Sequence, residues 1–425
     1  MEGEAEFVGS GSFRVDKERA LEVLRDYQLP DPAMFLAAWL RCAEASGASE
    51  VSISGTDGGV DVGFDGTPFT LKELSDVYSP ILSPSPRQER NRELALGLLA
   101  ALRGRACVTV RSGDGMLSVP KLGEESASAG KSRGTVLRAA WEGGAPVPDW
   151  RAWLKPETAC AMARARVRVD GRTLQRAPDP PGSLAFQKGS ARGWLRVRAG
   201  VGGLESSLLV YKHGVLACRF ECDLPAPVTG ILNDDRLTLD ISQQGVVRNP
   251  RLERLLRYLG TLCLELVKRT LSEHEACVRE LPGLLSKPRL LDVWKERSAF
   301  SASMRYPWSW EEVRASLLGS AHASGHGFGE LSIRVLEAAW RMDWLHRAAA
   351  AQALPALRSA PLFLRAGGGF MSLAEADALR ERLGSIPYSW RTAAAGGDAV
   401  WCPSPNEHAW LKMHFGEAIR EESSS

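Results

Sequence analysis

An apolar helix followed by a β-hairpin limits the fold of the N-terminal part of this chain. Residues 34–46 are apolar on most faces of a helix, so we expect this helix to be buried, with Gly47 at its C-terminal cap. Residues 50–54 and 60–64 then alternate as strands, and Thr56-Asp57-Gly58-Gly59 is suited to the hairpin turn between them. A buried helix next to an antiparallel hairpin predicts layers of helix and sheet.

The same mixture of helices and strands is expected to continue to residue 141. Helices are expected at 16–26, 71–77 and 93–102, and strands at 107–110, 116–120 and 135–140. Residues 79–92 hold three prolines and many polar residues, which predicts a loop. We therefore expect an N-terminal α/β domain at 13–141.

Two further domains are expected after a linker that is rich in glycine and proline, at 142–149. The second domain, at 150–286, is expected to be α/β. Its expected elements are a helix at 156–166, strands at 167–169, 193–198, 207–211, 215–221 and 236–241, and a long helix at 248–280. Residues 287–421 are expected to form a mainly helical, tryptophan-rich domain. The predicted fold class is α+β.

Composition excludes several classes of protein. The 425 residues carry 53 Lys and Arg against 51 Asp and Glu, and a net charge of +2 does not favour a nucleic-acid partner held by a global positive field. The eight cysteines form no CxxC pair, so we expect reduced thiols rather than a disulfide framework or a zinc ribbon. There is no apolar run of about 20 residues and no apolar signal core near Met1. These features predict a cytoplasmic protein without a membrane partner.

Four segments of the first domain resemble the GHKL (Bergerat) ATPase superfamily, which includes the ninety-kilodalton heat-shock chaperones, MutL, DNA gyrase and histidine kinases. Residues 34–53 are similar to its ELxxNxxDA helix and first strand. Residues 60–74 are similar to its DxGxG strand, turn and following helix. Residues 94–110 are similar to its glycine-started helix and strand, and 133–136 to its GT strand. The resemblance implies an α/β sandwich that binds nucleotide.

The second domain is similar to the middle domain of the heat-shock chaperones, including the bacterial HtpG-like members. The segment that carries this resemblance is 229–244, TGILNDDRLTLDISQQ, which is similar to the chaperone pattern GVVDSEDLPLNISRE. The residues that align directly are Gly230, Leu237, Leu239, Ile241 and Ser242. The two resemblances together cover roughly the first two thirds of the chain.

The resemblance also shows where catalytic chemistry is missing. The family's water-activating carboxylate and its magnesium-binding Asn lie four residues apart on one helix, so they project from the same face. The alignment puts Ala38 and Cys42 at these positions. Alanine has no base, and a thiol is a poor ligand for a hard cation. The middle-domain Arg that reaches the γ-phosphate aligns with Gln243, which carries no positive charge.

Other residues match the nucleotide site only in part. The adenine-binding Asp aligns with Phe64, the neighbouring Asp65 is one residue along, and the motif's two glycines align with Gly66 and Pro68. By resemblance, the residues nearest to such a site are Asp65, Gly66, Gly97 and Thr135.

Several of these residues also have a structural interpretation. Phe64 could fill the adenine position or belong to the core of a buried strand. Gly97 could shape a phosphate site at a helix N-terminus or permit close packing. Thr135 could line the pocket or be a β-branched residue in a strand.

The sequence therefore predicts a degenerate GHKL protein that is chaperone-like or a scaffold, binds another protein and does not hydrolyse ATP. No cofactor is expected, although ATP and magnesium would bind if the pocket were open. The alternative is an active HtpG-like ATPase that uses Asp65 for adenine and Glu44 for water. We expect at least one of Trp308 and Trp310 to be exposed and to bind the partner. The spacings His322-x3-His326 and His274-x2-Cys277 are attributed to chance rather than to metal binding.

Overall fold

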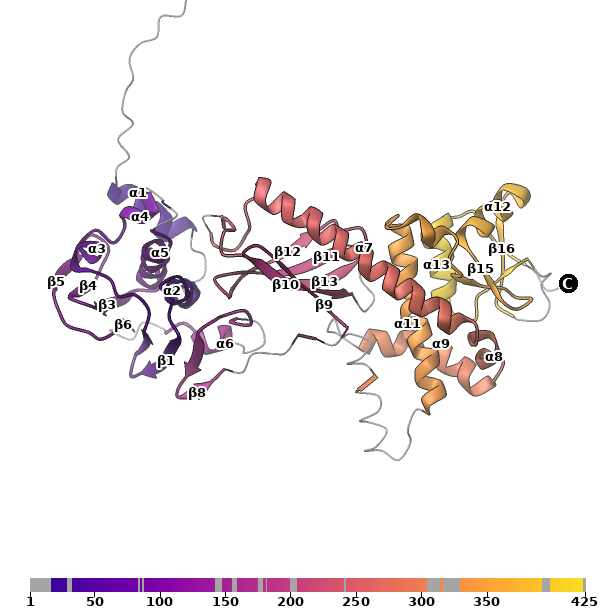
Figure 1. Ribbon diagram of the computed structural model, residues 1–425, viewed down its shortest axis with the longest axis horizontal. Helices are drawn as coiled ribbons and strands as arrows, with labels where there is room; N and C mark the ends of the chain where they lie inside the picture. Colours follow the sequence, from indigo (N-terminus) through magenta and orange to yellow (C-terminus); the bar gives the residue numbers. More distant parts are fainter. Residues whose placement is uncertain are drawn as a thin grey trace, which may run out of the picture. The chain divides into compact units, whose positions relative to one another are not determined.

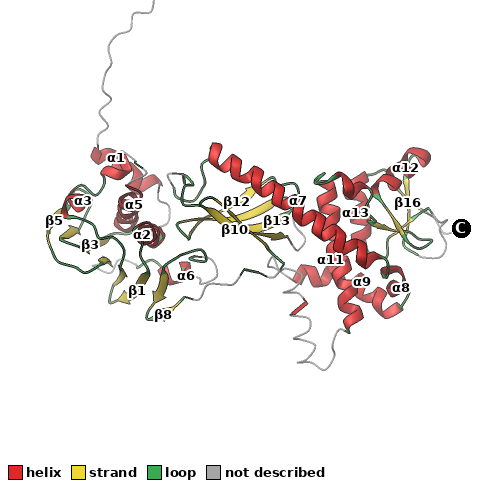
Figure 2. Cartoon of the chain, in the orientation of Figure 1, coloured by secondary structure: helices red, strands yellow, loops and turns green. Residues whose placement is uncertain are grey.

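The computed structural model describes most of the chain. The described residues are 17–28, 33–82, 85, 88–141, 147–154, 159–174, 179–180, 182–198, 205–240, 242–303, 314–315, 329–391 and 398–422. Helices and strands occur together throughout these residues (Figure 2), so the chain is a mixed α and β protein. The described part contains no helix that is both long and apolar enough to cross a membrane.

The chain forms two compact units. The first comprises residues 1–177, 211–218 and 233–246, and the second comprises 178–210, 219–232 and 247–425. The first unit therefore includes two short segments that follow residue 177 in the sequence.

An eight-stranded sheet is the centre of the first unit (Figure 1). Its strand order is β5-β4-β3-β6-β2-β1-β7-β8, with β1 and β7 parallel and the other neighbours antiparallel. The strands are β1 (Glu50–Thr56), β2 (Gly59–Phe64), β3 (Ala106–Ser112), β4 (Gly115–Val119), β5 (Ser126–Ala129), β6 (Thr135–Trp141), β7 (Arg166–Val169) and β8 (Arg172–Thr173). Residues 167–169, expected in the second domain, therefore extend this sheet beside β1.

The helices of the first unit pack on this sheet because their apolar faces need cover. They are α1 (Lys17–Val23), α2 (Met34–Ala45), α3 (Leu71–Ser75), α4 (Ser79–Leu82), α5 (Glu89–Arg103) and α6 (Trp150–Trp153), with a π-helical turn at Leu24–Gln28. Side chains of α2 and α5 join those of β1–β4 and β6 in one hydrophobic core. Thr70 caps α3 through a capping box with Glu73, which explains why the helix starts at Leu71.

The second unit contains most of a five-stranded sheet and a set of helices. The sheet order is β12-β11-β13-β10-β9, with strands β9 (Leu184–Lys188), β10 (Ala191–Val197), β11 (Ser206–Lys212), β12 (Val215–Cys222) and β13 (Val228–Asn233). The longest helix, α7 (Pro250–Val278), begins where Asn249 caps it and Pro250 occupies its first turn. The cap and the fixed φ of proline both favour a helix start at this point.

The C-terminal region combines helices with short strands. Its helices are α8 (Leu281–Leu285), α9 (Pro288–Ser303), α11 (Glu330–Ala350), α12 (Leu373–Leu383) and α13 (Pro405–Phe415), with a 3-10 turn at Pro355–Arg358. Its strands are β14 (Phe363–Leu364), β15 (Phe370–Met371), β16 (Ile386–Ser389), β17 (Val400–Trp401) and β18 (Ile419–Glu421). The expectation of a mainly helical region holds for the described residues, with two small sheets added.

Three sequence expectations are wrong. The expected loop at 79–92 contains α4 and the first turn of α5, because Pro80 lies in a first helical turn, where its missing N–H has no cost. The described part of the expected helix at 156–166 forms turns, and Arg166 begins β7. In the expected strand at 236–241, the described residues form only one bridge, between Leu239 and Val246.

Candidate functional site

The helix α2 carries the two positions where the resemblance puts catalytic groups. Ala38 is 3% exposed and Cys42 is fully buried. Burial raises the pKa of the Cys42 thiol far above its ordinary value, so the sulfur stays protonated and cannot serve as an anionic metal ligand. This face of α2 offers neither a base nor a magnesium ligand.

Close packing of α5 against α2 explains Gly97. The structure places Gly97 in the middle of α5, not at its N-terminus, so this glycine has no helix-terminal N–H to offer a phosphate. A Cβ atom at position 97 would overlap the indole of Trp39 and would lie 3.2 Å from the carbonyl oxygen of Phe35. Of the two interpretations of Gly97, the geometry supports close packing, against a helix rather than against the sheet.

Asp65 uses its carboxylate to hold the loop between α2 and β1. Its Oδ1 accepts hydrogen bonds from the backbone N–H groups of Ser49 and Glu50, at 2.8 and 2.9 Å, and its Oδ2 accepts one from the hydroxyl of Ser49 at 2.5 Å. These hydrogen bonds, above all the one from the Ser49 side chain, lower the pKa of Asp65. Three bonds from the protein itself give this carboxylate a structural role.

The other predicted pocket residues lie against protein atoms. Phe64 is 6% exposed and is the register partner of Thr135 across β2 and β6. Thr135 is buried, with its hydroxyl 2.6 Å from that of Ser112. A Cβ atom at Gly66 would overlap the side chain of Ser46 at the end of α2. Phe64 and Thr135 thus meet within the sheet, whereas Gly66 adjoins Ser46 at the end of α2.

A buried ion pair joins α2 to α5, and the sequence analysis did not find it. Arg41 Nε donates to Glu93 Oε2 at 2.9 Å, and both side chains are 0% exposed. Burial raises the pKa of the Glu93 carboxyl, but the charges of Arg41 and Lys212 and the hydrogen bond from Arg41 outweigh burial and lower the pKa on balance. An arginine within an otherwise apolar helix was the available sequence signal.

Gln243, which aligns with the γ-phosphate Arg, contacts this ion pair. Its Oε1 accepts a hydrogen bond from Arg41 Nη2 at 3.4 Å, and its Nε2 donates to the carbonyl of Asp240 at 2.9 Å. Gln243 is 2% exposed and has a left-handed backbone with φ of 61°. Nearby, Lys212 pairs with Glu89 of α5 at 2.5 Å. The polar side chains of segments 211–218 and 233–246 are therefore engaged with protein groups of α2 and α5.

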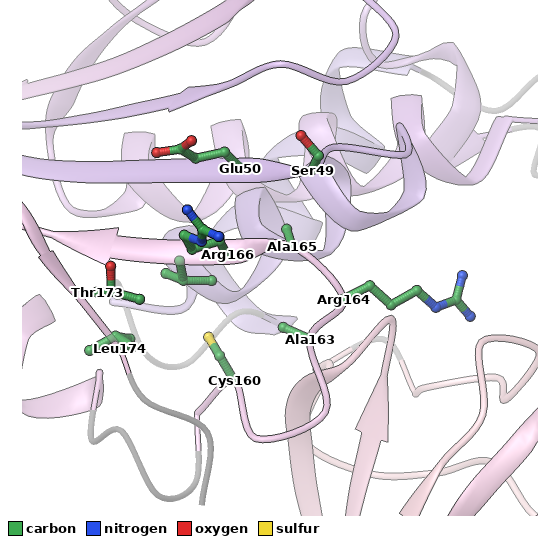
Figure 3. A pocket seen from close by; sticks show the side chains of 10 residues that line it. Ser49, Glu50, Cys160, Ala163, Arg164, Ala165, Arg166, Thr173 and Leu174 are labelled. Atoms are coloured by element: carbon green, nitrogen blue, oxygen red, sulfur yellow. The ribbon is translucent and has the colours of Figure 1, made fainter.

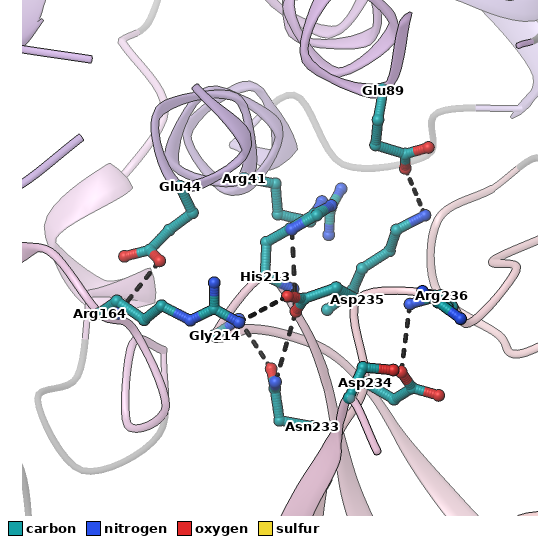
Figure 4. A network of polar contacts seen from close by, with 12 residues as sticks. Arg41, Glu44, Glu89, Arg164, His213, Gly214, Asn233, Asp234, Asp235 and Arg236 are labelled. Atoms are coloured by element: carbon teal, nitrogen blue, oxygen red, sulfur yellow. Dashed lines mark hydrogen bonds and ion pairs between the residues drawn. The ribbon is translucent and has the colours of Figure 1, made fainter. Parts of the chain in front are cut away.

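A second polar cluster engages Glu44, the alternative water-activating residue (Figure 4). The Glu44 carboxylate accepts hydrogen bonds from the backbone N–H groups of Arg164 and Ala165, at 3.1 and 2.8 Å. The Arg164 guanidinium pairs with Asp235 at 2.9 Å, and Asp235 lies 3.7 Å from His213. Burial lowers the pKa of His213 although Asp235 opposes this shift, which favours a neutral imidazole. Glu44 thereby fixes the 159–165 turn segment.

A cavity of about 800 Å³ lies next to this cluster, at the start of β1 and along β7 and β8 (Figure 3). It is lined by Ser49, Glu50, Cys160, Ala163, Arg164, Ala165, Arg166, Val167, Thr173 and Leu174. None of the four predicted nucleotide-site residues lines it. Burial raises the pKa of the Cys160 thiol to about 12, so this cysteine is a poor nucleophile.

Two further groups of predicted site residues have separate outcomes. Trp308 and Trp310 lie outside the described residues, as do His322 and His326. His274 is buried, with its Nε2 2.9 Å from the carbonyl oxygen of Pro361, and Cys277 lies 3.2 Å from Arg341 Nη1. Among the described residues, no group of three or more His, Cys, Asp or Glu side chains is placed to hold a metal ion.

Comparison with known proteins adds no assignment. The sequence matches neither a known family model nor a curated protein. The chemistry of the site therefore depends on the geometry above, in which each candidate catalytic residue is buried, apolar or hydrogen-bonded to the protein itself.

Proposed function

We propose that this chain is a chaperone-like or scaffolding protein-binding module built on a degenerate GHKL fold, and that it does not hydrolyse ATP. The observation that carries the proposal is the state of α2 at the two catalytic positions. Ala38 and Cys42 are both buried, and Gly97 of α5 packs directly on the neighbouring Trp39. A helix that is sealed in this way offers no base and no metal ligand to a bound nucleotide.

The polar contacts argue against the alternative, an active ATPase with displaced residues. Asp65 accepts hydrogen bonds from Ser49 and Glu50, and Glu44 accepts them from Arg164 and Ala165. A general base must be within hydrogen-bond reach of the proton that it abstracts, and these carboxylates hold backbone N–H groups instead. The absence of a positive charge at Gln243 supports the same conclusion.

The test is thermal unfolding of the purified chain with and without Mg-ATP, combined with a steady-state hydrolysis assay. A ligand at 100 times its dissociation constant stabilises a folded protein by about 2.7 kcal/mol. The proposal predicts no nucleotide-dependent shift and no turnover above background. Magnesium-dependent turnover that Glu44→Gln abolishes would support the alternative instead.

A further inference from the structure

A second cavity lies at the edge of the first unit's sheet, remote in sequence from the α2 positions. Its volume is about 460 Å³, within the range typical of ligand pockets and far above the roughly 10–15 Å³ that one water needs. The residues that line it come from α1, the end of α3 and the turn after it, β4, the following loop and β5. They are Leu21, Glu22, Leu74, Ser75, Asp76, Val77, Tyr78, Leu117, Leu122, Gly123, Glu125 and Ala127.

The walls of this edge cavity are apolar and its charges are all negative. Leu21, Leu74, Val77 and Leu117 are each at most 5% exposed and form the apolar walls. Glu22, Asp76 and Glu125 supply three carboxylates, and no Lys, Arg or His is among the described residues that line the cavity. Apolar walls with an acidic rim suit a ligand that carries both an apolar group and a positive charge.

Tyr78 provides a polar group that points to a ligand. The residue is only 5% exposed, yet its hydroxyl has no hydrogen-bond partner among the described residues. A buried hydroxyl without a partner costs about 1–3 kcal/mol, so such groups call for an explanation. A basic group that enters the cavity would donate a hydrogen bond to this oxygen and remove the cost.

The strand next to the cavity is an open edge. β5 is the outermost strand of the eight-stranded sheet, and its four residues, Ser-Ala-Ser-Ala, are all exposed. Proteins normally protect such an edge with charge, proline or a bulge, and β5 contains neither charge nor proline. Ala127 lies opposite Leu117 in the β4–β5 register, and both residues line the cavity. Because side chains alternate along a strand, Ser126 and Ser128 are on the other face.

We propose that the β5 edge and the adjoining cavity bind an extended, basic peptide segment of a partner protein. The peptide main chain adds a strand to β5. Every second side chain then lies on the face of Ala127, where an apolar residue enters the cavity and a Lys or Arg reaches Tyr78 and the acidic rim (β4, β5, α1 and α3 in Figure 1). The proposal deepens the proposed protein-binding function and rests on it only in assigning a peptide partner.

The test uses a fluorescent peptide in which threonine alternates with valine and lysine, so that valine and lysine share one face. The control peptide has glutamate in place of lysine. We expect the basic peptide to bind at least about tenfold more tightly than the acidic one at low salt, with a smaller difference at high salt. On binding, the outward amides of residues 126–129 should become protected from hydrogen exchange.

Matched variants separate a docking face from a general effect on folding. Ala127→Trp, on the cavity face, should weaken binding about tenfold or more, whereas Ser128→Trp, one residue along on the other face, should change it less than about twofold. Tyr78→Phe should weaken binding about fivefold without lowering the unfolding temperature, because the hydroxyl has no partner among the described residues of the free protein.

The proposal is overturned if neither peptide binds, if both bind equally, or if the two tryptophan variants behave alike. A chain that forms dimers which Ala127→Trp dissociates would assign the edge to a second copy and would also overturn it. These outcomes are independent of nucleotide binding, so the peptide proposal can fail while the assignment as a non-hydrolysing module stands.

Discussion

Breaking the buried pair between Arg41 and Glu93 should destabilise the first unit strongly. The side chains meet at 2.9 Å with no exposure, and the Arg41 guanidinium makes a further, longer hydrogen bond to Gln243 at 3.4 Å. Removing one partner of a buried ion pair typically costs about 3–5 kcal/mol, because the other charge stays buried without compensation. For a unit of about 200 residues this corresponds to a fall of roughly 6–20 °C in unfolding temperature.

The assay is differential scanning calorimetry of a double-mutant cycle. Arg41→Met and Glu93→Leu should each lower the unfolding temperature by that amount, and the double variant should recover most of the loss, since two apolar side chains replace the pair. Lys121→Ala is the matched control. It removes an exposed pair with Glu124, at 3.7 Å, and should cost at most about 1 kcal/mol. Additive losses in the double variant would refute the coupling that the structure implies.

Acid should weaken the same pair. The pKa of Glu93 is lowered below its ordinary value of 4.5 in the folded state, so the unfolded chain binds this proton more readily. The contribution of Glu93 to stability is complete above about pH 4.5 and is lost as the pH falls through the lower folded-state pKa. The stability advantage of the wild-type pair over Glu93→Leu should shrink in that range, and an unchanged difference would contradict the assignment.

Three further substitutions test individual contacts by urea denaturation. Gly97→Ala should cost about 1–3 kcal/mol because its Cβ would overlap Trp39, whereas the matched Gly283→Ala in α8, with open space around it, should be neutral or gain up to about 1 kcal/mol. Asp65→Ala should cost about 1–3 kcal/mol through the N–H groups of Ser49 and Glu50; unchanged stability with lost nucleotide binding would restore the adenine role. Burial lowers the pKa of His274 to about 4, so the unfolded chain gains the proton first, and roughly 2–3 kcal/mol of stability should be lost between pH 6.5 and 4.5; His274→Gln should remove this loss, and an equal loss in the variant would contradict it.

The elements that sequence patterns predicted are those that local interactions determine. The hairpin of β1 and β2 has alternating side chains and a glycine-rich turn, and α2 is apolar on most faces, so both were found close to their observed bounds. The start of α3 follows from Thr70, whose side chain caps the helix. In each case the information lies within a few neighbouring residues.

Other features depend on pairing between distant residues. Arg41 and Glu93 are 52 positions apart, so neither residue alone indicates the ion pair. β5, with the sequence Ser-Ala-Ser-Ala, has no hydrophobic alternation and forms because β4 lies beside it. Residues 159–165 form turns whose backbone is held by Glu44, more than 100 positions earlier. The loss of catalytic residue types was visible in the sequence, but the burial of Ala38 and Cys42 required the structure.

The most direct test of the central claim is a calorimetric titration of the full chain with Mg-ATP, alongside the same titration of Glu44→Gln. The account predicts no saturable heat of binding for either protein, because α2 offers buried Ala38 and Cys42 where a nucleotide site needs a base and a metal ligand. Saturable, magnesium-dependent binding to the wild-type chain, with hydrolysis that Glu44→Gln abolishes, would contradict it.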